Sequence, residues 1–296
     1  MRHPVGSIAR DFGDRPDISA RSVLVTIFGD SIVPVGGEIW LGDLIALAEP
    51  FGFSDRLTRT SVSRLTAEGW FESQRVGRRS RYRLTEFGVA EFEVAERRIY
   101  HADRPHWDGE WTLAMVELGS PDRTTAQLVS KHLRWHGFAP LSSGVMAEPG
   151  DSRAEVREVS AGLGLSAAIP VALARFDDLR ALLSAPEVDQ RLGLDEAADG
   201  YRRFVERYAL LEAMCGADVA PLDAFLLRSM VVHDLRRTVL VDPWLPAEIL
   251  PSGWPGSAAH ELAGRLYRAV DSGAWAHLAE VTGATVSSEV AAHRFG

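Results

Sequence analysis

Cysteine is almost absent from this chain of 296 residues, because Cys215 is the only one. A single cysteine excludes an intrachain disulfide. It also excludes a cysteine-based zinc site, since no further cysteine or suitably placed histidine completes one. The sequence contains no run of 18 apolar residues, so we expect no transmembrane helix. Residues 1–20 contain no apolar core, so we expect no secretory signal and a place in the reducing cytoplasm.

An excess of positive charge is also lacking, since 41 acidic residues outnumber 32 basic ones and the formal net charge is −9. Taken alone, this balance argues against a nucleic-acid binder. The charge is unevenly distributed, however. Residues 54–84 contain eight arginines and three acids, which leaves +5 in that segment and −14 on the rest. A small basic region on an acidic body favours a module that binds a polyanion.

The segment from residue 21 to residue 100 has the element order of a winged helix-turn-helix. Its apolar spacing, capping residues and turn glycines predict helix, strand, helix, helix, hairpin and helix in succession. The expected elements lie at residues 21–28, 38–41, 41–48, 54–68, 70–84 and 85–100. Ser54 or Asp55 caps the fourth element and Thr85 the last one. Gly77, Arg78 and Arg79 join the two hairpin strands, so the tip of the hairpin is basic.

The helix at 54–68 has two chemically different faces when its residues are placed 100° apart. Four residues share one face: Leu57, Ser61, Val62 and Leu65. The opposite face is polar and suits the major groove, where arginine binds guanine and Ser or Thr binds phosphates and base edges. With the hairpin tip, the predicted DNA contacts are Arg56, Arg59, Thr60, Ser63, Arg64, Arg78, Arg79 and Arg81. The alternative is a solvated helix face beside a basic turn.

The remainder of the chain predicts two further domains. Residues 107–178 show the order β-α-β-β-α-β, which is typical of a ferredoxin-like sandwich. Residues 179–296 are mostly helical and form the expected effector and dimerisation domain. With a winged helix at 21–102 and a flexible tail at 1–20, the expected fold class is α+β in three domains.

An ordered set of short motifs runs through all three segments. It begins with SVLVTIFGD and GGEIWLGDLI, and continues with RTSVSRLTAEGW, GRRSRYRLT and a helix ending in RRIY. WDGEW follows at Trp107–Trp111, and RRTVLVDPWLPAEILPSGWPG runs from Arg236 to Gly256. This set resembles the PaaX family of bacterial transcriptional repressors of aromatic-acid catabolism. The resemblance covers most of residues 21–270.

The resemblance implies a homodimer that binds a palindromic operator on double-stranded DNA. It also implies an effector, because the namesake members leave DNA when they bind phenylacetyl-coenzyme A. Such a thioester needs arginines or backbone donors for its phosphates and an aromatic-lined apolar slot for its aryl group. The candidate contacts are Trp135, His136, Arg175, Arg236, Arg237 and Trp244. Each of these has an alternative role, in the core or in a surface ion pair.

A nucleic-acid-processing enzyme is the competing hypothesis. The middle domain resembles the small nuclease-like proteins of CRISPR adaptation, which need an acid near the end of the first strand. Glu117 and Asp122 lie close to that place, but they lack the spacing of a metal site. His132 and His136 are four residues apart on one predicted helix, and no third ligand accompanies them. We therefore expect no catalytic residue, no metal and no cofactor.

Overall fold

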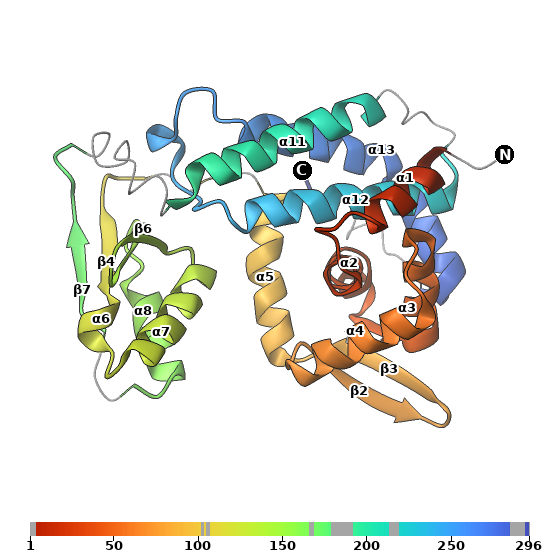
Figure 1. The fold of residues 1–296 in the computed structure, drawn as a ribbon, viewed down its shortest axis with the longest axis horizontal. Coiled ribbons are helices and arrows are strands. Elements are labelled where there is room, and N and C mark those ends of the chain that lie inside the picture. The colour runs from red at the N-terminus through yellow and green to blue at the C-terminus, as the bar shows by residue number, and fades with distance from the viewer. Residues whose placement is uncertain are drawn as a thin grey trace. The chain divides into compact units, whose positions relative to one another are not determined.

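The computed structural model describes residues 4–101, 104, 107–165, 169–178, 192–212, 219–284 and 294–295. The chain divides into two compact units (Figure 1). Unit 1 contains residues 1–102, 202–237 and 257–296, and unit 2 contains residues 103–201 and 238–256. The segment expected as one C-terminal domain is therefore shared between the units. The reason is that two long helices, α11 (Leu194–Glu212) and α12 (Pro221–Val239), each pass from one unit into the other.

The N-terminal part of unit 1 contains the predicted succession of elements. They are α2 (Ala20–Ile27), β1 (Glu38–Trp40), α3 (Leu41–Ala48), α4 (Asp55–Ala67), β2 (Phe71–Val76), β3 (Arg79–Leu84) and α5 (Glu86–Tyr100). A π-helical turn, η1 (Phe28–Ile32), and two short 3-10 turns, η2 (Val33–Val35) and η3 (Glu49–Phe51), complete the set. The three strands form an antiparallel sheet in the order β1-β3-β2, so β3 is central.

Side-chain caps fix where α4 and α5 begin. The Ser54 hydroxyl accepts a hydrogen bond from the Leu57 amide at 3.3 Å, and the Thr85 hydroxyl accepts one from the Gly88 amide at 3.0 Å. The Thr85 hydroxyl also donates to the Gly69 carbonyl, which ties the start of α5 to the end of α4. Both caps satisfy amides that the first helical turn leaves without a partner.

Removal of the Thr85 hydroxyl is expected to destabilise unit 1. Thr85→Ala loses the cap and the bond to Gly69, so the free energy of unfolding should fall by about 0.5–2 kcal/mol. Thr85→Ser keeps the hydroxyl and serves as the control. Urea denaturation followed by circular dichroism measures both variants. Equal midpoints for Thr85→Ala and Thr85→Ser would contradict the capping role.

The expected flexible tail at 1–20 is corrected by the structure, which has a helix there, α1 (Pro4–Gly13). Phe12 on this helix is buried, and its ring forms a T-shaped contact with the His233 ring at a centroid distance of 5.3 Å. Just beyond α1, Arg15 forms an ion pair with Asp234 at 2.9 Å. The apolar spacing Val5, Ala9 and Phe12 is helical, but polar and glycine residues around it weaken the signal.

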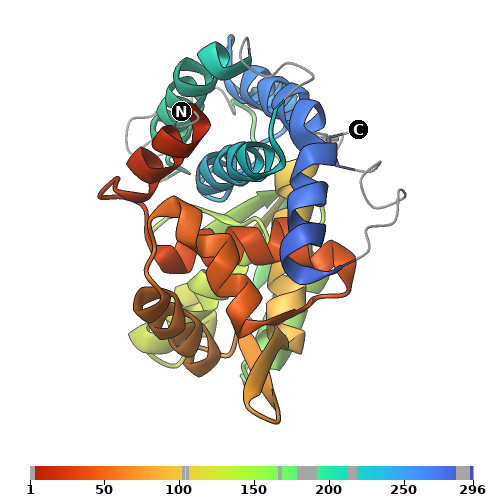
Figure 2. The same ribbon diagram turned by 90° about the vertical axis from the view of Figure 1, so that its right-hand side faces the viewer.

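Helix α12 is the central helix of unit 1, because every residue from Asp223 to Leu235 is buried. Figures 1 and 2 show it surrounded by other helices, among them α13 (Gly256–Thr282). A helix that is buried on all sides shows little amphipathic pattern. Among the described helices, none combines the length and the apolar character needed to cross a membrane.

Unit 2 is built on a second antiparallel sheet, with strands in the order β5-β6-β4-β7. Its elements are β4 (Trp111–Met115), α6 (Val116–Gly119), α7 (Arg123–Trp135), β5 (Ala139–Ser142), β6 (Val145–Pro149), α8 (Arg153–Gly162) and β7 (Val171–Ala174). One core joins the sheet to α7 and α8 through Val129, Met146 and Val156. A second core contains Trp111 and Leu245, so residues of the 238–256 segment complete this unit.

Candidate nucleic-acid interface

Helix α4 turns one polar face to solvent. The predicted DNA-contacting residues of this helix are all exposed: Arg56, Arg59, Thr60, Ser63 and Arg64. Its buried residues are Thr58, Ser61, Val62 and Leu65. Leu57, which was expected to share the face of Ser61, is 46% exposed instead. The buried residues follow the spacing i, i+3, i+4, i+7, which places Thr58 inward although leucine is the more apolar residue.

The arginines of α4 differ in what neutralises them. Arg59 donates to the Asp55 carboxylate one turn earlier, with Nη2 and Oδ2 3.3 Å apart, and this pair is exposed. The side chains of Arg56 and Arg64 have no hydrogen-bond or ion-pair partner among the described residues. Arg56 and Arg64 are thus available to an external anion. Arg59 can leave its exposed pair with Asp55 for such an anion at little cost in free energy.

The Trp40 ring of β1 contacts two arginines of the hairpin. Arg79 and Arg81 lie two residues apart on β3, and each guanidinium carbon is 4.5 Å from the centroid of the Trp40 ring. Arg81 also donates to Glu38 at 2.9 Å, and Arg79 lies 3.7 Å from Asp43. These contacts restrict both side chains, and cation–π stacking adds to the ion pairs. Sequence reasoning missed Trp40, although its place on a strand near the basic hairpin was a usable signal.

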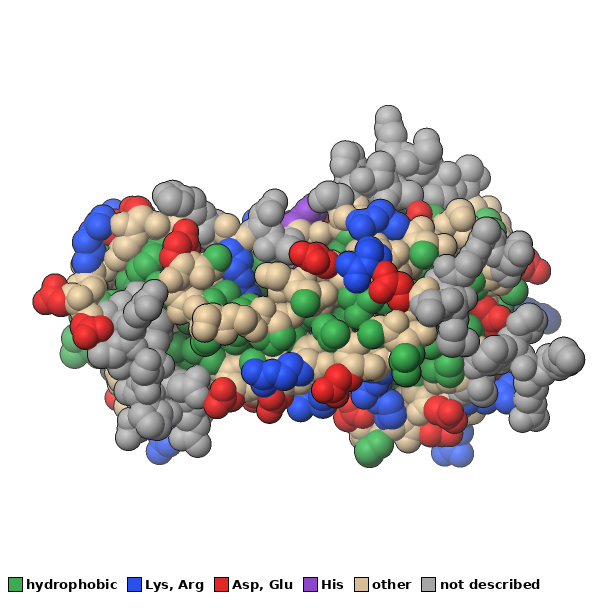
Figure 3. Space-filling model, turned by 90° about the horizontal axis from the view of Figure 1, so that it is seen from above, with side chains coloured by type: hydrophobic (Ala, Val, Ile, Leu, Met, Phe, Trp, Pro, Cys, Tyr) green, Lys and Arg blue, Asp and Glu red, His purple; other side chains and the backbone are tan. Residues whose placement is uncertain are grey.

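Arg78 occupies the tip of the hairpin, between β2 and β3, and is exposed. Its side chain has no hydrogen-bond or ion-pair partner in the part of the chain that the structure describes. Figure 2 shows the hairpin projecting beyond the helices, and α4 packs against β2. Helix α4 and the hairpin therefore lie side by side (Figures 1 and 2). On the face drawn in Figure 3, acidic and basic side chains are interspersed instead.

Two residues predicted for the effector belong to unit 1 and already have partners there. Arg236 donates to the hydroxyl and the carbonyl of Ser22 at 3.0 and 3.3 Å. Burial, together with the neighbouring Arg237, lowers the pKa of Arg236 to about 10. Arg237 forms an ion pair with Asp17. Both guanidinium groups thus hold α12 to the N-terminal segment, which accounts for them without a ligand.

The other predicted effector residues belong to unit 2. Arg175 donates to the Asp108 carbonyl at 2.9 Å and pairs with Glu110 at 3.3 Å. Trp244 has a φ of 55°, in the left-handed region, and its ring lies 4.6 Å from the guanidinium carbon of Arg104. His136 is exposed at the end of α7, and the side chain of Trp135 lies outside what the structure describes. Effector binding by these residues stays a prediction.

The two acids considered for a nuclease have separate roles. Asp122 caps α7 by accepting a bond from the Thr125 amide at 2.8 Å, and that bond is the main cause of its lowered pKa. Glu117 accepts from the Ser143 hydroxyl at 3.3 Å. Within the described ranges, no group of three or more His, Cys, Asp or Glu residues could hold a metal ion. The contacts of Asp122 are those of a helix cap rather than of a metal ligand.

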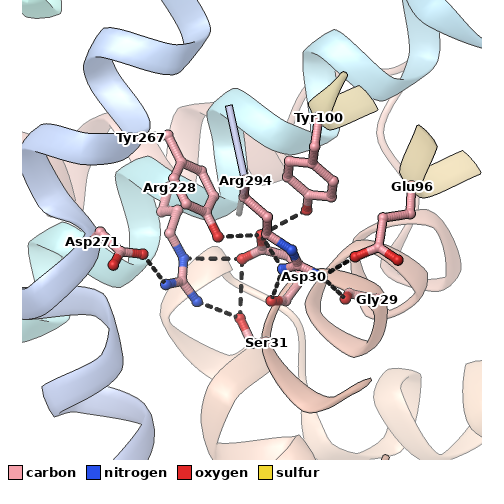
Figure 4. A network of polar contacts seen from close by, with 9 residues as sticks. All are labelled: Gly29, Asp30, Ser31, Glu96, Tyr100, Arg228, Tyr267, Asp271 and Arg294. Atoms are coloured by element: carbon pink, nitrogen blue, oxygen red, sulfur yellow. Dashed lines mark hydrogen bonds and ion pairs between the residues drawn. The ribbon is translucent and has the colours of Figure 1, made fainter. Parts of the chain in front are cut away.

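A buried polar network in unit 1 was not predicted from the sequence (Figure 4). Its centre is Asp30 in the π-helical turn, whose side chain has no exposed surface. Asp30 pairs with Arg228 of α12 at 2.9 Å and accepts from Tyr100 of α5 at 2.7 Å and Tyr267 of α13 at 3.2 Å. Arg294 forms a further ion pair with Asp30, at 3.3 Å. One carboxylate therefore joins four segments that are distant in the sequence.

Arg228 extends this network and is itself fully buried. It donates to Ser31 at 3.0 Å and to Asp271 at 3.1 Å, and its guanidinium carbon lies 4.0 Å from the centroid of the Trp275 ring. The available signal in the sequence was a lone charge within each of two apolar stretches, IFGDSIV and FLLRSMVV. Buried charges are normally paired, so the charged residue in such a stretch is expected to have a partner of opposite charge.

These features define a two-unit α+β protein with a candidate nucleic-acid-binding surface on α4 and the β2–β3 hairpin. The chain belongs to the PaaX family. The matching family models are PaaX-like protein at residues 19–88, PaaX protein central Cas2-like domain at residues 104–184, and PaaX-like protein C-terminal domain at residues 192–280.

Two relatives illustrate the similarity. The chain is 37% identical over 273 residues to the transcriptional repressor PaaX of Escherichia coli (strain K12), across 89% of this chain and 84% of that protein. It is also similar in structure to the uncharacterized protein Rv0674 from Mycobacterium tuberculosis, with a TM-score of 0.52 and 22% identity. That match covers 86% of this chain and 98% of the other. The second relative supports a shared fold and nothing more.

Proposed function

We propose that the chain is a DNA-binding transcriptional repressor of a phenylacetate-type catabolic operon. The observation that carries this proposal is the exposed polar face of α4, on which Arg56 and Arg64 have no partner among the described residues, next to a basic hairpin. The relative that is 37% identical is named a transcriptional repressor, which supports the same function. A repressor needs no catalytic residue, and the contacts of Glu117 and Asp122 give the nuclease hypothesis no support.

In this proposal the segment from α2 to α5 acts as a winged helix-turn-helix. Helix α4 enters the major groove, which its exposed residues face: Arg56, Arg59, Thr60 and Ser63. The hairpin is the wing, and Arg78, Arg79 and Arg81 hold the phosphate backbone. The sheet order β5-β6-β4-β7, combined with the order β-α-β-β-α-β, supports a ferredoxin-like sandwich in unit 2.

We also propose a homodimer that an acyl-coenzyme A such as phenylacetyl-coenzyme A releases from its operator. Two recognition helices must be spaced by about one turn of DNA, roughly 34 Å, to fit a palindromic site. A ligand releases such a dimer if it binds better to a state in which this spacing is lost. The protein would act in the cytoplasm, where its DNA lies.

Arg78→Ala is expected to weaken binding to all duplexes by the same factor, because a phosphate contact carries no sequence information. The slope of log affinity against log salt should fall by about one, since one fewer counterion is released. Anisotropy titrations over a salt series, with specific and scrambled duplexes, measure both quantities. Arg265→Ala, at an exposed ion pair on α13, is the control. A loss confined to the specific duplex would contradict the role of the wing.

The proposed function is tested by fluorescence anisotropy with labelled DNA from the protein's own promoter region. Full-length protein is titrated over a salt series, with and without phenylacetyl-coenzyme A. Specific binding that the thioester releases is the expected result. Specific binding that ignores the thioester would keep the repressor and remove this effector. Equal affinity for promoter and scrambled DNA would contradict a repressor of this promoter.

A further inference from the structure

Unit 2 contains a pocket of about 360 Å³ beside helix α7. One face of α7 supplies most of its polar lining, namely Arg123, Gln127, Ser130, Lys131 and Arg134. The spacing of these residues, i, i+4, i+7, i+8 and i+11, keeps them on one side of the helix through three turns. A volume of this size lies within the range of small-molecule sites, roughly 300–1,000 Å³.

The side chains that line the pocket carry more positive charge than negative charge. Arg123, Lys131 and Arg134 are exposed, and their side chains have no hydrogen-bond or ion-pair partner among the described residues. Two other arginines of the same unit have acidic partners, since Arg153 binds Asp151 at 2.7 Å and Arg175 binds Glu110 at 3.3 Å. The pocket contains one carboxylate, Glu117, which accepts from the Ser143 hydroxyl. Three cations and one anion leave a net charge of +2 directed at the pocket.

We propose that this pocket binds the phosphate groups of a small nucleotide, namely the coenzyme A part of an acyl-coenzyme A. The identity of the ligand rests on the proposed function, and the pocket is its proposed binding site. Arginine is suited to phosphate because its planar fork donates two hydrogen bonds at once.

The distribution of donors along α7 fits a ligand with phosphates at two positions. Arg123 and Arg134 mark the two ends of the lining, about 16 Å apart along the helix axis. Coenzyme A carries a 3′-phosphate on its ribose and a diphosphate on the 5′ side. Flexible arginine side chains from the two ends can each take one of these groups. Gln127 and Ser130 between them offer neutral donors, and Glu117 can accept from an amine or hydroxyl of the nucleoside.

Isothermal titration calorimetry on the full-length protein tests the proposal, with unacylated coenzyme A as the probe. Arg123→Gln and Arg134→Gln each remove a charge-assisted bond, so each should weaken binding by about tenfold or more. Arg157→Gln, at an exposed arginine of α8 outside the pocket lining, is the matched control and should bind as the parent does. Dephospho-coenzyme A, which lacks the 3′-phosphate, should bind more weakly to the parent and lose its sensitivity to one of the two arginines.

Each variant is also assayed for promoter DNA binding without ligand, which should stay unchanged. Equal affinity of parent, Arg123→Gln and Arg134→Gln for coenzyme A would overturn the pocket and leave the proposed repressor intact. A parent that binds promoter DNA but neither coenzyme A nor its thioester would overturn both the pocket and the effector. Weaker DNA binding by the variants, with coenzyme A affinity unchanged, would assign the pocket to DNA and also overturn the proposal. Arg134→Lys should restore part of the affinity, and no restoration would also count against a phosphate contact.

Discussion

Replacing Arg228 with methionine is expected to lower the free energy of unfolding by about 3–5 kcal/mol. Methionine has a similar length but no charge, so Asp30 keeps its place in the core and loses its main ion-pair partner (Figure 4). Ser31 and Asp271 lose a donor in the same step. The cost comes from leaving a carboxylate buried with too little compensation, which is larger than the net value of the pair.

Arg265→Met provides the matched control for this prediction. Arg265 forms an ion pair with Glu212 at 2.5 Å, but both partners are exposed, so its loss should leave the unfolding midpoint nearly unchanged. Asp30→Asn added to Arg228→Met should recover part of the stability, because the unpaired charge is then removed. Guanidinium unfolding of the three variants measures these differences. If Arg228→Met unfolds at the same midpoint as Arg265→Met, the network does not stabilise the fold as described.

Arg59→Ala is expected to weaken binding to the operator by about 1–3 kcal/mol, roughly 5- to 150-fold. In the free protein its guanidinium donates to Asp55, and this exposed pair must be exchanged for a base contact. The lost contact specifies sequence, so preference for one base pair should relax while binding to scrambled DNA changes little. Competition titrations with single-base variants of the operator measure this preference.

Arg59→Lys separates charge from hydrogen-bond geometry at the same position. Lysine keeps the charge but lacks the planar fork, so it should retain non-specific affinity and still lose base preference. Arg265→Ala, outside the proposed surface, should behave as the parent. An Arg59→Ala protein with parental preference at every base pair would show that α4 does not read the sequence through this residue.

Local signals in the sequence were enough for the elements around the candidate site. The caps Ser54 and Thr85 act on amides three residues away, so they can be read without any knowledge of the fold. The exposed arginines of α4 followed from its helical spacing. Leu57 was expected on the buried face but is exposed, and Thr58 is buried in its place. Tertiary packing, which the local sequence does not encode, determines which side of the helix is covered.

Long-range partners could not be derived in the same way. Asp30 and Arg228 are nearly 200 residues apart, and the residues near each of them give no indication of its ion-pair partner. Arg236 and Arg237 were candidate phosphate contacts because arginine suits phosphate, and nothing near them in the sequence indicated their contacts with Ser22 and Asp17. The division into two compact units has no local signal in the sequence for a related reason. A helix buried on all sides, such as α12, carries no pattern that says which segments surround it.

Methylation interference on the promoter DNA shows whether α4 contacts bases in the major groove. Guanine N7 lies in the major groove and adenine N3 in the minor groove. If α4 binds in this way, N7 methylation blocks binding in two half-sites whose centres lie about 10 base pairs apart, and Arg59→Ala loses the effect at one guanine in each. Interference from adenine N3 alone, or from no base at all, would contradict this mode of binding.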